Sequence, residues 1–437
     1  MRKILLAMGV ISVLLASRGV AEAQLTVAPA RVTNEPAATL LLPYFEVELP
    51  KKIGGTSKGI TTLFTVNNAS ATAVLAHVTV WSDLAVPVTN FNIYLTGYDT
   101  QTVNLFDVLN GHLPRTGSDG QDPQDTISKQ GPISQDINFA SCSGQLPYPD
   151  PIPEESTQHL RSSLTGQPSA LFGGKCSGRA LGDKRPIARG FITIDTVNNC
   201  TLRFPGDPGY FNFGDVTNQN VLWGDYVLIN KSKKVARGDA LVHIQASSTD
   251  PLTANAGNYT FYQSLDANDS TDFRQPLATI YAGRFVNVPK HPVFPTGTSV
   301  IAWRDCKVKQ VPFTCGALPS PFPLSEESVV VFDEQENPEI PVLPPIPPFP
   351  ATDIMPFPAA TQIVKVGGSA LPVATTSGWI LFNMNTTVAG VNAPATDPAA
   401  AQATMTMVLD SKGKYSAAYR AVNLDSATDT NSSHSSF

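Results

Sequence analysis

The stretch Val74-Leu75-Ala76-His77-Val78-Thr79-Val80-Trp81 decides the fold class of this chain. Successive side chains of an extended strand point to opposite faces, so two alternating sets are separated here. The first set is Val74, Ala76, Val78 and Val80, and the second is Leu75, His77, Thr79 and Trp81. Thr62–Val66 is similarly rich in β-branched and aromatic residues, and Asn67-Asn68-Ala69-Ser70 between the two stretches has the composition of a turn. The sequence therefore predicts a pair of strands here.

Similar signals continue along most of the chain. Further strands are expected at Phe91–Thr96, Val103–Leu105, Gly190–Thr196, Trp223–Ile229, Ala240–Ala246, Tyr259–Gln263, Leu277–Phe285, Ser299–Trp303, Val329–Phe332, Trp379–Met384, Met405–Asp410 and Tyr415–Val422. One short helix is expected around Leu160 and Leu164, which lie four residues apart and are followed by Gly166. Many short strands with frequent turns predict an all-β fold of antiparallel β-sandwich units.

Composition divides the chain into seven segments. In order, these are a signal peptide (1–23), a first β-sandwich unit (24–113), a long irregular, loop-rich insertion with the short helix (114–189), a second β-unit (190–336), a Pro-rich linker (337–360), a C-terminal β segment (361–425) and a disordered tail (426–437). Because proline lacks a backbone donor, the Pro-rich linker is expected to be an extended crossing between β-units. An alternative is that the first strands of the second unit complete the sheet begun in the first.

The start of the chain predicts export. Arg2 and Lys3 precede the apolar stretch Ile4–Ala16, and Ala21-Glu22-Ala23 has the A-x-A pattern of a cleavage site, so the mature chain is expected to begin at Gln24. Cleavage removes three of 30 basic and one of 36 acidic residues, which leaves a net charge of −8. An acidic chain argues against nucleic acid as a partner. No later apolar run is long enough for a transmembrane segment, which leaves the periplasm, the cell surface or the extracellular space.

The five cysteines are Cys142, Cys176, Cys200, Cys306 and Cys315, and export makes disulfides the expectation. Cys306 and Cys315 flank a short stretch that can form a hairpin, so they are predicted to pair. Cys142 and Cys176 lie at the ends of a loop-rich segment and form the second predicted pair, with Cys200 an equally good partner for either. The remaining cysteine is expected to be a buried thiol at a strand end.

Several motifs resemble a group of uncharacterised exported bacterial proteins. They are Leu41–Val47, Thr61–Asn68, Leu75–Asp83, Tyr94–Asp99 and Ile137–Cys142. This resemblance implies export and no activity. The order of a strand, an Asn-rich turn, a second strand and a later strand ending in Val103-Asn104-Leu105 is similar to the immunoglobulin-like sandwiches of bacterial surface proteins. That similarity implies a fold and nothing catalytic.

No catalytic residue is assigned from the sequence. H-E-x-x-H, G-x-S-x-G and P-loop motifs are absent, and His77 and His243 lie inside predicted strands, where a hydrogen-bonded structural histidine is the expectation. Four tryptophans, Trp81, Trp223, Trp303 and Trp379, are expected in the core, with a flat surface for sugar rings as the alternative.

The sequence assigns no cofactor and no firm metal ligand. Asp119, Asp122 and Asp125 lie three apart in one loop, and Asp266, Asn268, Asp269 and Asp272 cluster in another. Closely spaced oxygen donors can bind Ca²⁺, although neither loop has EF-hand spacing and solvated turn acids are the preferred interpretation.

These observations predict a non-enzymatic secreted or cell-surface β-sandwich protein that acts in binding or in an exported assembly, with an unknown protein or glycan as partner. Two alternatives stay open. A secreted hydrolase acting on polysaccharide requires a cleft with two carboxylates about 5 to 10 Å apart. A carbohydrate-binding module requires an exposed row of aromatic side chains.

Overall fold

The computed structural model describes residues 35–56, 59–117, 137, 139–211, 214–246, 260–262, 264–265, 272–288, 291–306, 309–319, 329–339, 341, 357–384, 402–411 and 416–424. The predicted signal peptide, most of the Pro-rich linker and the predicted tail lie outside these residues. Within them the fold is all-β, as predicted, with four antiparallel sheets. None of the described helices is long and apolar enough to cross a membrane.

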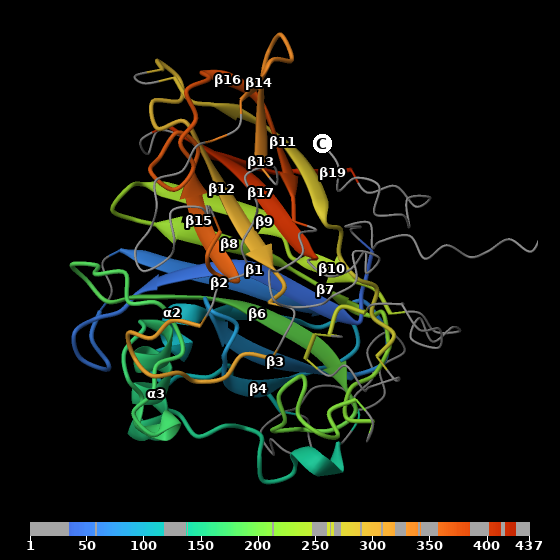
Figure 1. Cartoon of the computed structure of the whole chain (residues 1–437). Helices are drawn as coiled ribbons and strands as arrows, with labels where there is room; N and C mark the ends of the chain where they lie inside the picture. Colours follow the sequence, from blue (N-terminus) through green and yellow to red (C-terminus); the bar gives the residue numbers. More distant parts are fainter. Residues whose placement is uncertain are drawn as a thin grey trace, which may run out of the picture.

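The first two sheets pack face to face and form the N-terminal sandwich (Figure 1). One sheet has the strand order β10 (Val242–Ile244), β1 (Thr39–Glu48), β6 (Ile187–Val197), β3 (Val74–Ser82) and β4 (Pro87–Leu95). The other has the order β5 (Thr100–Asn104), β2 (Ile60–Asn68), β8 (Asp225–Asn230) and β9 (Val235–Ala240), and β7 (Leu222–Trp223) pairs with β2. Strands on both sides of the predicted insertion therefore share these sheets, which is the alternative arrangement that the sequence left open.

Strand β3 has the two faces that its sequence predicts. Ala76, Val78 and Val80 lie in the core between the two sheets, whereas Leu75 and Trp81 belong to separate clusters on the outer face. Every residue of β3 is buried, because other segments cover the outer face of its sheet. Polar side chains on that face are therefore buried as well, which requires them to find partners within the protein.

The insertion is mainly irregular and carries short helical elements. They are η1 (Ala140–Cys142), α3 (Glu154–Leu164) and η2 (Ala170–Phe172), and a further helix, α2 (Leu105–Val108), precedes the insertion. Helix α3 is the predicted helix: Leu160 and Leu164 pack into the core of the N-terminal sandwich, and Gly166, at φ +71°, follows its end.

The other two sheets form the C-terminal sandwich around a second core. One has the order β14 (Pro338–Glu339), β13 (Val329–Asp333), β16 (Ser377–Asn383), β11 (Ile280–Val286) and β19 (Val422–Asn423). The other has the order β15 (Thr361–Lys365), β12 (Thr298–Arg304), β17 (Ala403–Asp410) and β18 (Ser416–Arg420). The antiparallel pairing of β17 with β18 confirms the predicted hairpin.

One predicted strand is wrong. Of Tyr259–Gln263, residues 260–262 are described, and they form a turn rather than a strand. The aromatic side chains that produced the prediction, Phe261 and Tyr262, are buried where the two sandwiches meet. Their burial therefore comes from side-chain packing between sandwiches instead of sheet pairing.

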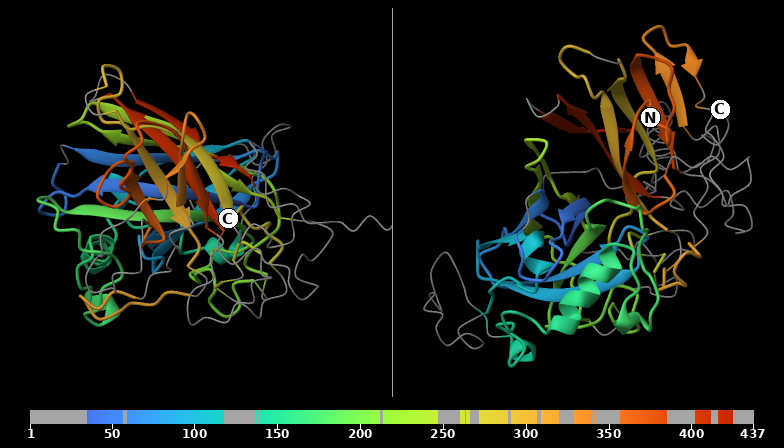
Figure 2. Two further views of the ribbon diagram at one scale, coloured as in Figure 1. Left: turned by 45° about the horizontal axis from the view of Figure 1, so that its top comes forward. Right: turned by 90° about the vertical axis from the view of Figure 1, so that its left-hand side faces the viewer.

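The C-terminal sandwich lies against the N-terminal one, and the right-hand view of Figure 2 separates its yellow-to-red strands from the blue and green strands beneath. In β12, Val300 and Ala302 face the C-terminal core, whereas Ile301 packs with Tyr44 of β1. At Pro43, which cannot donate to the ladder, the pairing of β1 with β6 shifts register. The Pro43 carbonyl accepts a hydrogen bond from Thr361 Oγ1 of β15, which joins the two sandwiches directly.

The disulfides differ from those predicted. Cys142 pairs with Cys200, and Cys176 pairs with Cys315, which leaves Cys306 as the free thiol. The predicted pair Cys306–Cys315 is therefore wrong, and of the two partners left open for Cys142 it is Cys200, not Cys176, that pairs with it.

Backbone contacts between distant segments explain both pairings. Ser141 Oγ accepts a hydrogen bond of 3.0 Å from the Cys200 amide, so η1 is held against the chain that leaves β6. Cys176 and Phe313 exchange two backbone hydrogen bonds of 2.9 Å, which brings the segment before Cys315 to the insertion. Cys306 instead follows the end of β12 and is partly buried.

Candidate functional site

A small, partly open pocket lies at the junction of the two sandwiches. Its walls are mostly aromatic. Trp81 comes from β3, Phe191 from β6 and Trp303 from β12, while Phe261 and Tyr262 come from the segment that connects the sandwiches. Thus the pocket exists only where the two sandwiches and their connection meet.

The sheet register and the docking of the sandwiches set the geometry of the aromatic walls. Trp81 and Phe191 are direct cross-strand partners, and their rings stack with centroids 5.6 Å apart and an interplanar angle of 1°. Trp303 meets Phe191 edge to face at 5.8 Å, and Phe261 stacks on Trp303 at 5.6 Å. These are the offset and edge-to-face arrangements that aromatic rings prefer, so the wall is well ordered.

The indole N–H groups of Trp81 and Trp303 differ in whether they have a hydrogen-bond partner. Trp81 Nε1 donates a hydrogen bond of 2.9 Å to Thr193 Oγ1. Trp303 is only 5% exposed, yet its Nε1 has no hydrogen-bond partner among the described residues. Buried donors in native proteins are usually satisfied, so this N–H is the exceptional polar atom of the aromatic wall.

The polar edge of the pocket consists of Ser264, Arg304, Asp305 and Cys306. Ser264 Oγ donates to Asp305 Oδ1 at 2.8 Å, and Gln402 Nε2 lies 3.4 Å from Asp305 Oδ2. Burial raises the pKa of the Cys306 thiol to about 12 and lowers the pKa of the Arg304 guanidinium to about 10. At neutral pH the edge therefore holds a protonated thiol and a charged arginine.

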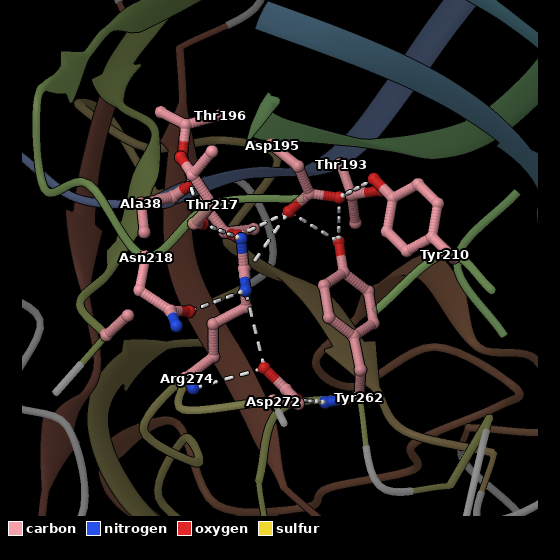
Figure 3. A network of polar contacts seen from close by, with 12 residues as sticks. Ala38, Thr193, Asp195, Thr196, Tyr210, Thr217, Asn218, Tyr262, Asp272 and Arg274 are labelled. Atoms are coloured by element: carbon pink, nitrogen blue, oxygen red, sulfur yellow. Dashed lines mark hydrogen bonds and ion pairs between the residues drawn. The ribbon is translucent and has the colours of Figure 1, made fainter. Parts of the chain in front are cut away.

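A buried polar network, shown in Figure 3, reaches the pocket through Tyr262, which belongs to both. The Asp195 carboxylate accepts hydrogen bonds from Tyr210 Oη at 2.7 Å and from Tyr262 Oη at 2.9 Å. Arg274 Nε lies 3.4 Å from Asp195 Oδ1, and its Nη1 lies 3.4 Å from Asp272 Oδ1. Thr39 of β1 donates to Asp195 and accepts from Arg274.

The network places the single Arg274 guanidinium between the two carboxylates of Asp195 and Asp272, and burial raises the pKa of Asp272. Burial lowers the pKa of Arg274, but the carboxylates of Asp195 and Asp272 outweigh it and raise that pKa above its ordinary value. Burial also raises the pKa of Tyr210 and Tyr262 well above the usual range, so both phenols stay neutral donors. Since Tyr262 bonds to Asp195 and also lines the pocket, the network positions the connecting segment at the pocket wall.

The two histidines singled out in the sequence lie outside the pocket lining. His77 Nδ1 is 2.9 Å from Asn92 Oδ1, and His243 Nδ1 is 2.8 Å from the Glu35 carbonyl oxygen. Both rings are fully buried, and burial lowers the pKa of each. Their environment matches the expected structural histidines, and their effect on any activity stays a prediction.

The calcium candidates Asp119, Asp122 and Asp125 lie outside the described residues, as do Asp266, Asn268 and Asp269. Asp272, the remaining member of the second cluster, is described and pairs with Arg274. Within the described part of the chain, no three His, Cys, Asp or Glu side chains are grouped so that they could hold a metal ion.

The four tryptophans separate into different environments. Trp81 and Trp303 are buried in the pocket wall, Trp379 stacks on Phe332 at 4.0 Å, and Trp223 is 36% exposed. The expected core position is confirmed for Trp81 and Trp303, whereas the pocket that they line was not predicted from the sequence. The available signal was the position of Trp81 and Trp303, each at the next-to-last residue of a strand, where a side chain can reach past the edge of its own sheet.

Comparison with protein-family models, curated proteins and solved structures found no match. The described molecule belongs to the broad class of disulfide-bonded, two-sandwich β-proteins, and its functional assignment rests on the geometry of the pocket.

Proposed function

We propose that this chain is an exported, non-enzymatic binding protein that holds a small, mainly apolar ligand in the pocket between its two sandwiches. The aromatic wall formed by Trp81, Phe191, Phe261 and Trp303 carries this proposal. Small-molecule sites are typically concave and apolar with a few fixed polar groups, and they occur preferentially between domains.

The chemistry of the pocket supports binding over hydrolysis. Asp305 is the one carboxylate among the described lining residues, and it already accepts hydrogen bonds. A glycosidase needs two carboxylates about 5 to 10 Å apart. Cys306 is a poor nucleophile, because burial raises its pKa to about 12.

The same pocket argues against a carbohydrate-binding module. Such modules present flat aromatic faces to solvent, whereas Trp81 and Trp303 are almost fully buried. A small compound that enters the junction matches this arrangement better than an extended sugar chain.

Export is part of the proposal. Two disulfides are typical of oxidising compartments, and residues 1–23 have the features of a signal peptide. We further propose that the exported protein is secreted or displayed at a bacterial cell surface, as its resemblance to exported bacterial proteins implies. Intact mass of exported protein is expected to show a chain that begins at Gln24, and retention of residues 1–23 would contradict this.

The binding proposal is tested by isothermal titration of the mature protein with naphthalene and coumarin, two small aromatic probes. We expect saturable binding with a dissociation constant on the order of tens of micromolar. Because Cys306 lines the pocket and is the free thiol, bound probe should also slow its modification by a maleimide.

A pocket-filling variant locates the binding. Leu265→Trp, at a lining residue, should weaken binding at least tenfold, whereas Leu202→Trp, at an exposed residue, should leave it unchanged. If neither probe saturates the wild type, or if Leu265→Trp binds as the wild type does, the proposal is wrong.

A further inference from the structure

We infer that lysine-rich loops at one end of the N-terminal sandwich bind the anionic lipid headgroups of a membrane surface. No residue of these loops lines the junction pocket, so the inference concerns a second binding surface. It goes beyond the small-molecule binding proposed above, because it assigns the surface that holds the exported protein in place.

Three loops meet at this end of the sandwich. The first joins β1 to β2, the second leads into β6, and the third is the turn between β8 and β9. The Leu49 amide donates to the Pro186 carbonyl at 2.9 Å, and the Lys231 amide donates to the Gly59 carbonyl at 2.7 Å. These hydrogen bonds hold the second and third loops against the first. In Figure 1 the three loops, in blue, green and yellow-green, project together on the left-hand side.

The three loops concentrate positive charge. Six of the chain's 16 lysines lie on them, and all six are exposed. These lysines are Lys51, Lys52, Lys184, Lys231, Lys233 and Lys234. None of the six has an ion-pair partner in the part of the chain that the structure describes.

The carboxylates beside these lysines are already paired with arginines. Asp183 is the one acidic residue on the three loops, and it pairs with Arg189 at 2.6 Å. Glu48, which precedes the first loop, pairs with Arg185 at 2.5 Å. Charges more than about 8 to 10 Å apart are largely screened at physiological salt. The lysines therefore form a local positive surface although the net charge of the chain is −6.

The residue types favour a membrane surface over other anionic partners. The loops contain no aromatic residue on which a base or a sugar ring could stack. Lysine is a point charge without the bidentate fork of arginine, which suits many separate headgroups better than one bound phosphate. Clusters of about four to eight basic side chains are typical of binding to anionic lipids. Loops that project side by side can contact such a flat surface at the same time.

The inference is tested by sedimentation of the mature chain with lipid vesicles. One set contains phosphatidylcholine with about 30 mol% phosphatidylglycerol, and the other contains phosphatidylcholine alone. We expect binding to the anionic vesicles only, and loss of binding when salt is raised from about 0.05 M to about 0.5 M. Absence of binding to the anionic vesicles, or equal binding to both sets, would overturn the inference.

Two double variants locate the binding surface. Lys51→Gln/Lys52→Gln changes the first loop, and Lys233→Gln/Lys234→Gln changes the third. Each lysine near an anionic surface contributes about fivefold to the partition coefficient, so each double variant should bind about twentyfold more weakly. All four side chains are exposed, so both variants are expected to melt as the wild type does.

The matched control is Lys175→Gln/Lys365→Gln. It removes the same charge from two exposed lysines outside the three loops and should change vesicle binding by less than about twofold. If the control weakens binding as much as the loop variants do, the binding follows net charge and the inference is overturned.

Polygalacturonate distinguishes an acidic polymer from a membrane. At equal concentrations of negative charge, tighter binding to polygalacturonate than to the anionic vesicles would assign the loops to a polymer and overturn the membrane inference. Coumarin titration of the loop variants keeps this result separate from the proposed function. Because the loops lie outside the lining of the junction pocket, coumarin binding should be the same as in the wild type.

Discussion

At the scale of single residues, the outer face of the first sheet is unusual because it is polar and yet buried. His77, Asp195 and Arg274 have no solvent-exposed surface. Each is held by partners from distant parts of the chain, such as Asn92 for His77 and Tyr262 for Asp195. Buried polar groups stabilise a protein only while all their partners are present, so single replacements here should be costly.

Replacing His77 or His243 with glutamine should lower the free energy of unfolding by about 1 to 3 kcal/mol, because a buried ring and its hydrogen bond are lost. Urea denaturation measures this. His112→Gln is the control, since His112 is about half exposed and pairs with Asp150 at the surface. A replacement that removed a measurable activity without changing stability would contradict the structural role.

The same histidines predict a dependence of stability on pH. Burial lowers the pKa of His77, His159 and His243 in the folded state, whereas the unfolded value is about 6.5. Below that pH the unfolded chain therefore binds protons that the folded chain does not. The free energy of unfolding should fall on acidification from about pH 6.5, by at most about 1.4 kcal/mol per pH unit for each histidine. Urea titrations between pH 7.5 and 5 should show a shallower slope for His77→Gln, and an unchanged slope would contradict this assignment.

Breaking the ionic network of Asp195, Arg274 and Asp272 should lower the free energy of unfolding more than the histidine replacements do. Asp195→Asn leaves the buried Arg274 cation with Asp272 alone, and removal of one partner of a buried ion pair costs about 3 to 5 kcal/mol. Lys309→Met is the control, because the pair of Lys309 and Asp207 is about one-third exposed and should contribute at most about 1 kcal/mol. Thermal and urea unfolding measure both, and equal losses for the two variants would contradict the role of the network.

At the scale of elements, each disulfide joins two irregular segments that lie far apart in sequence, and neither closes a local hairpin. Cys142–Cys200 spans 58 positions in sequence, and Cys176–Cys315 spans 139. The second disulfide ties the insertion of the N-terminal sandwich to the chain that follows β12 of the C-terminal sandwich. It therefore links the two sandwiches covalently at a second place.

Loss of the longer disulfide should destabilise the protein strongly. For Cys315→Ser, the chain-entropy model gives up to about 5 kcal/mol for a loop of 139 residues. Cys306→Ser should cost only about 1 kcal/mol, because it removes a partly buried thiol and no crosslink. Peptide mapping without reduction checks the pairing itself, and a peptide that joins Cys306 to Cys315 would contradict it.

At the scale of the whole molecule, the central strands β12 and β17 of the sheet β15-β12-β17-β18 bury side chains on both of their faces. Val300 and Met407 face the C-terminal core, and Ile301 and Val408 face Tyr44 and the N-terminal sandwich. The alternation of side chains along a strand thus gives one sheet two roles, as a wall of its own core and as the docking surface for the other sandwich. This docking also forms the junction pocket.

A charge placed in this docking surface should uncouple the sandwiches. Ile301→Glu would bury a carboxylate beside Tyr44 while both cores stay intact, so calorimetry should show two unfolding transitions in place of one cooperative transition. Ile363→Glu is the control, since Ile363 on β15 is 38% exposed and should leave one transition. A single transition for Ile301→Glu, with all structure lost together, would show that the two sandwiches do not fold independently.

The local sequence pattern was enough to predict most of the strands and helix α3. The period of two in Val74–Trp81 predicted both faces of β3, and Leu160, Leu164 and Gly166 predicted α3 and its end. These features depend on neighbours within a few residues, so the sequence contains their physical cause. The all-β class follows from the same local information.

Tertiary structure alone decided the cysteine partners, the turn at residues 260–262 and the pocket. Cys176 meets Cys315, and Trp81 shares a wall with Trp303, because of the order of strands in the sheets and the way one sandwich docks on the other. Those contacts join residues more than a hundred positions apart, and their free energy depends on the packing of whole sheets. No local periodicity encodes such a contact. For this reason the strands and helix α3 could be predicted from the sequence, whereas the cysteine partners and the pocket could not.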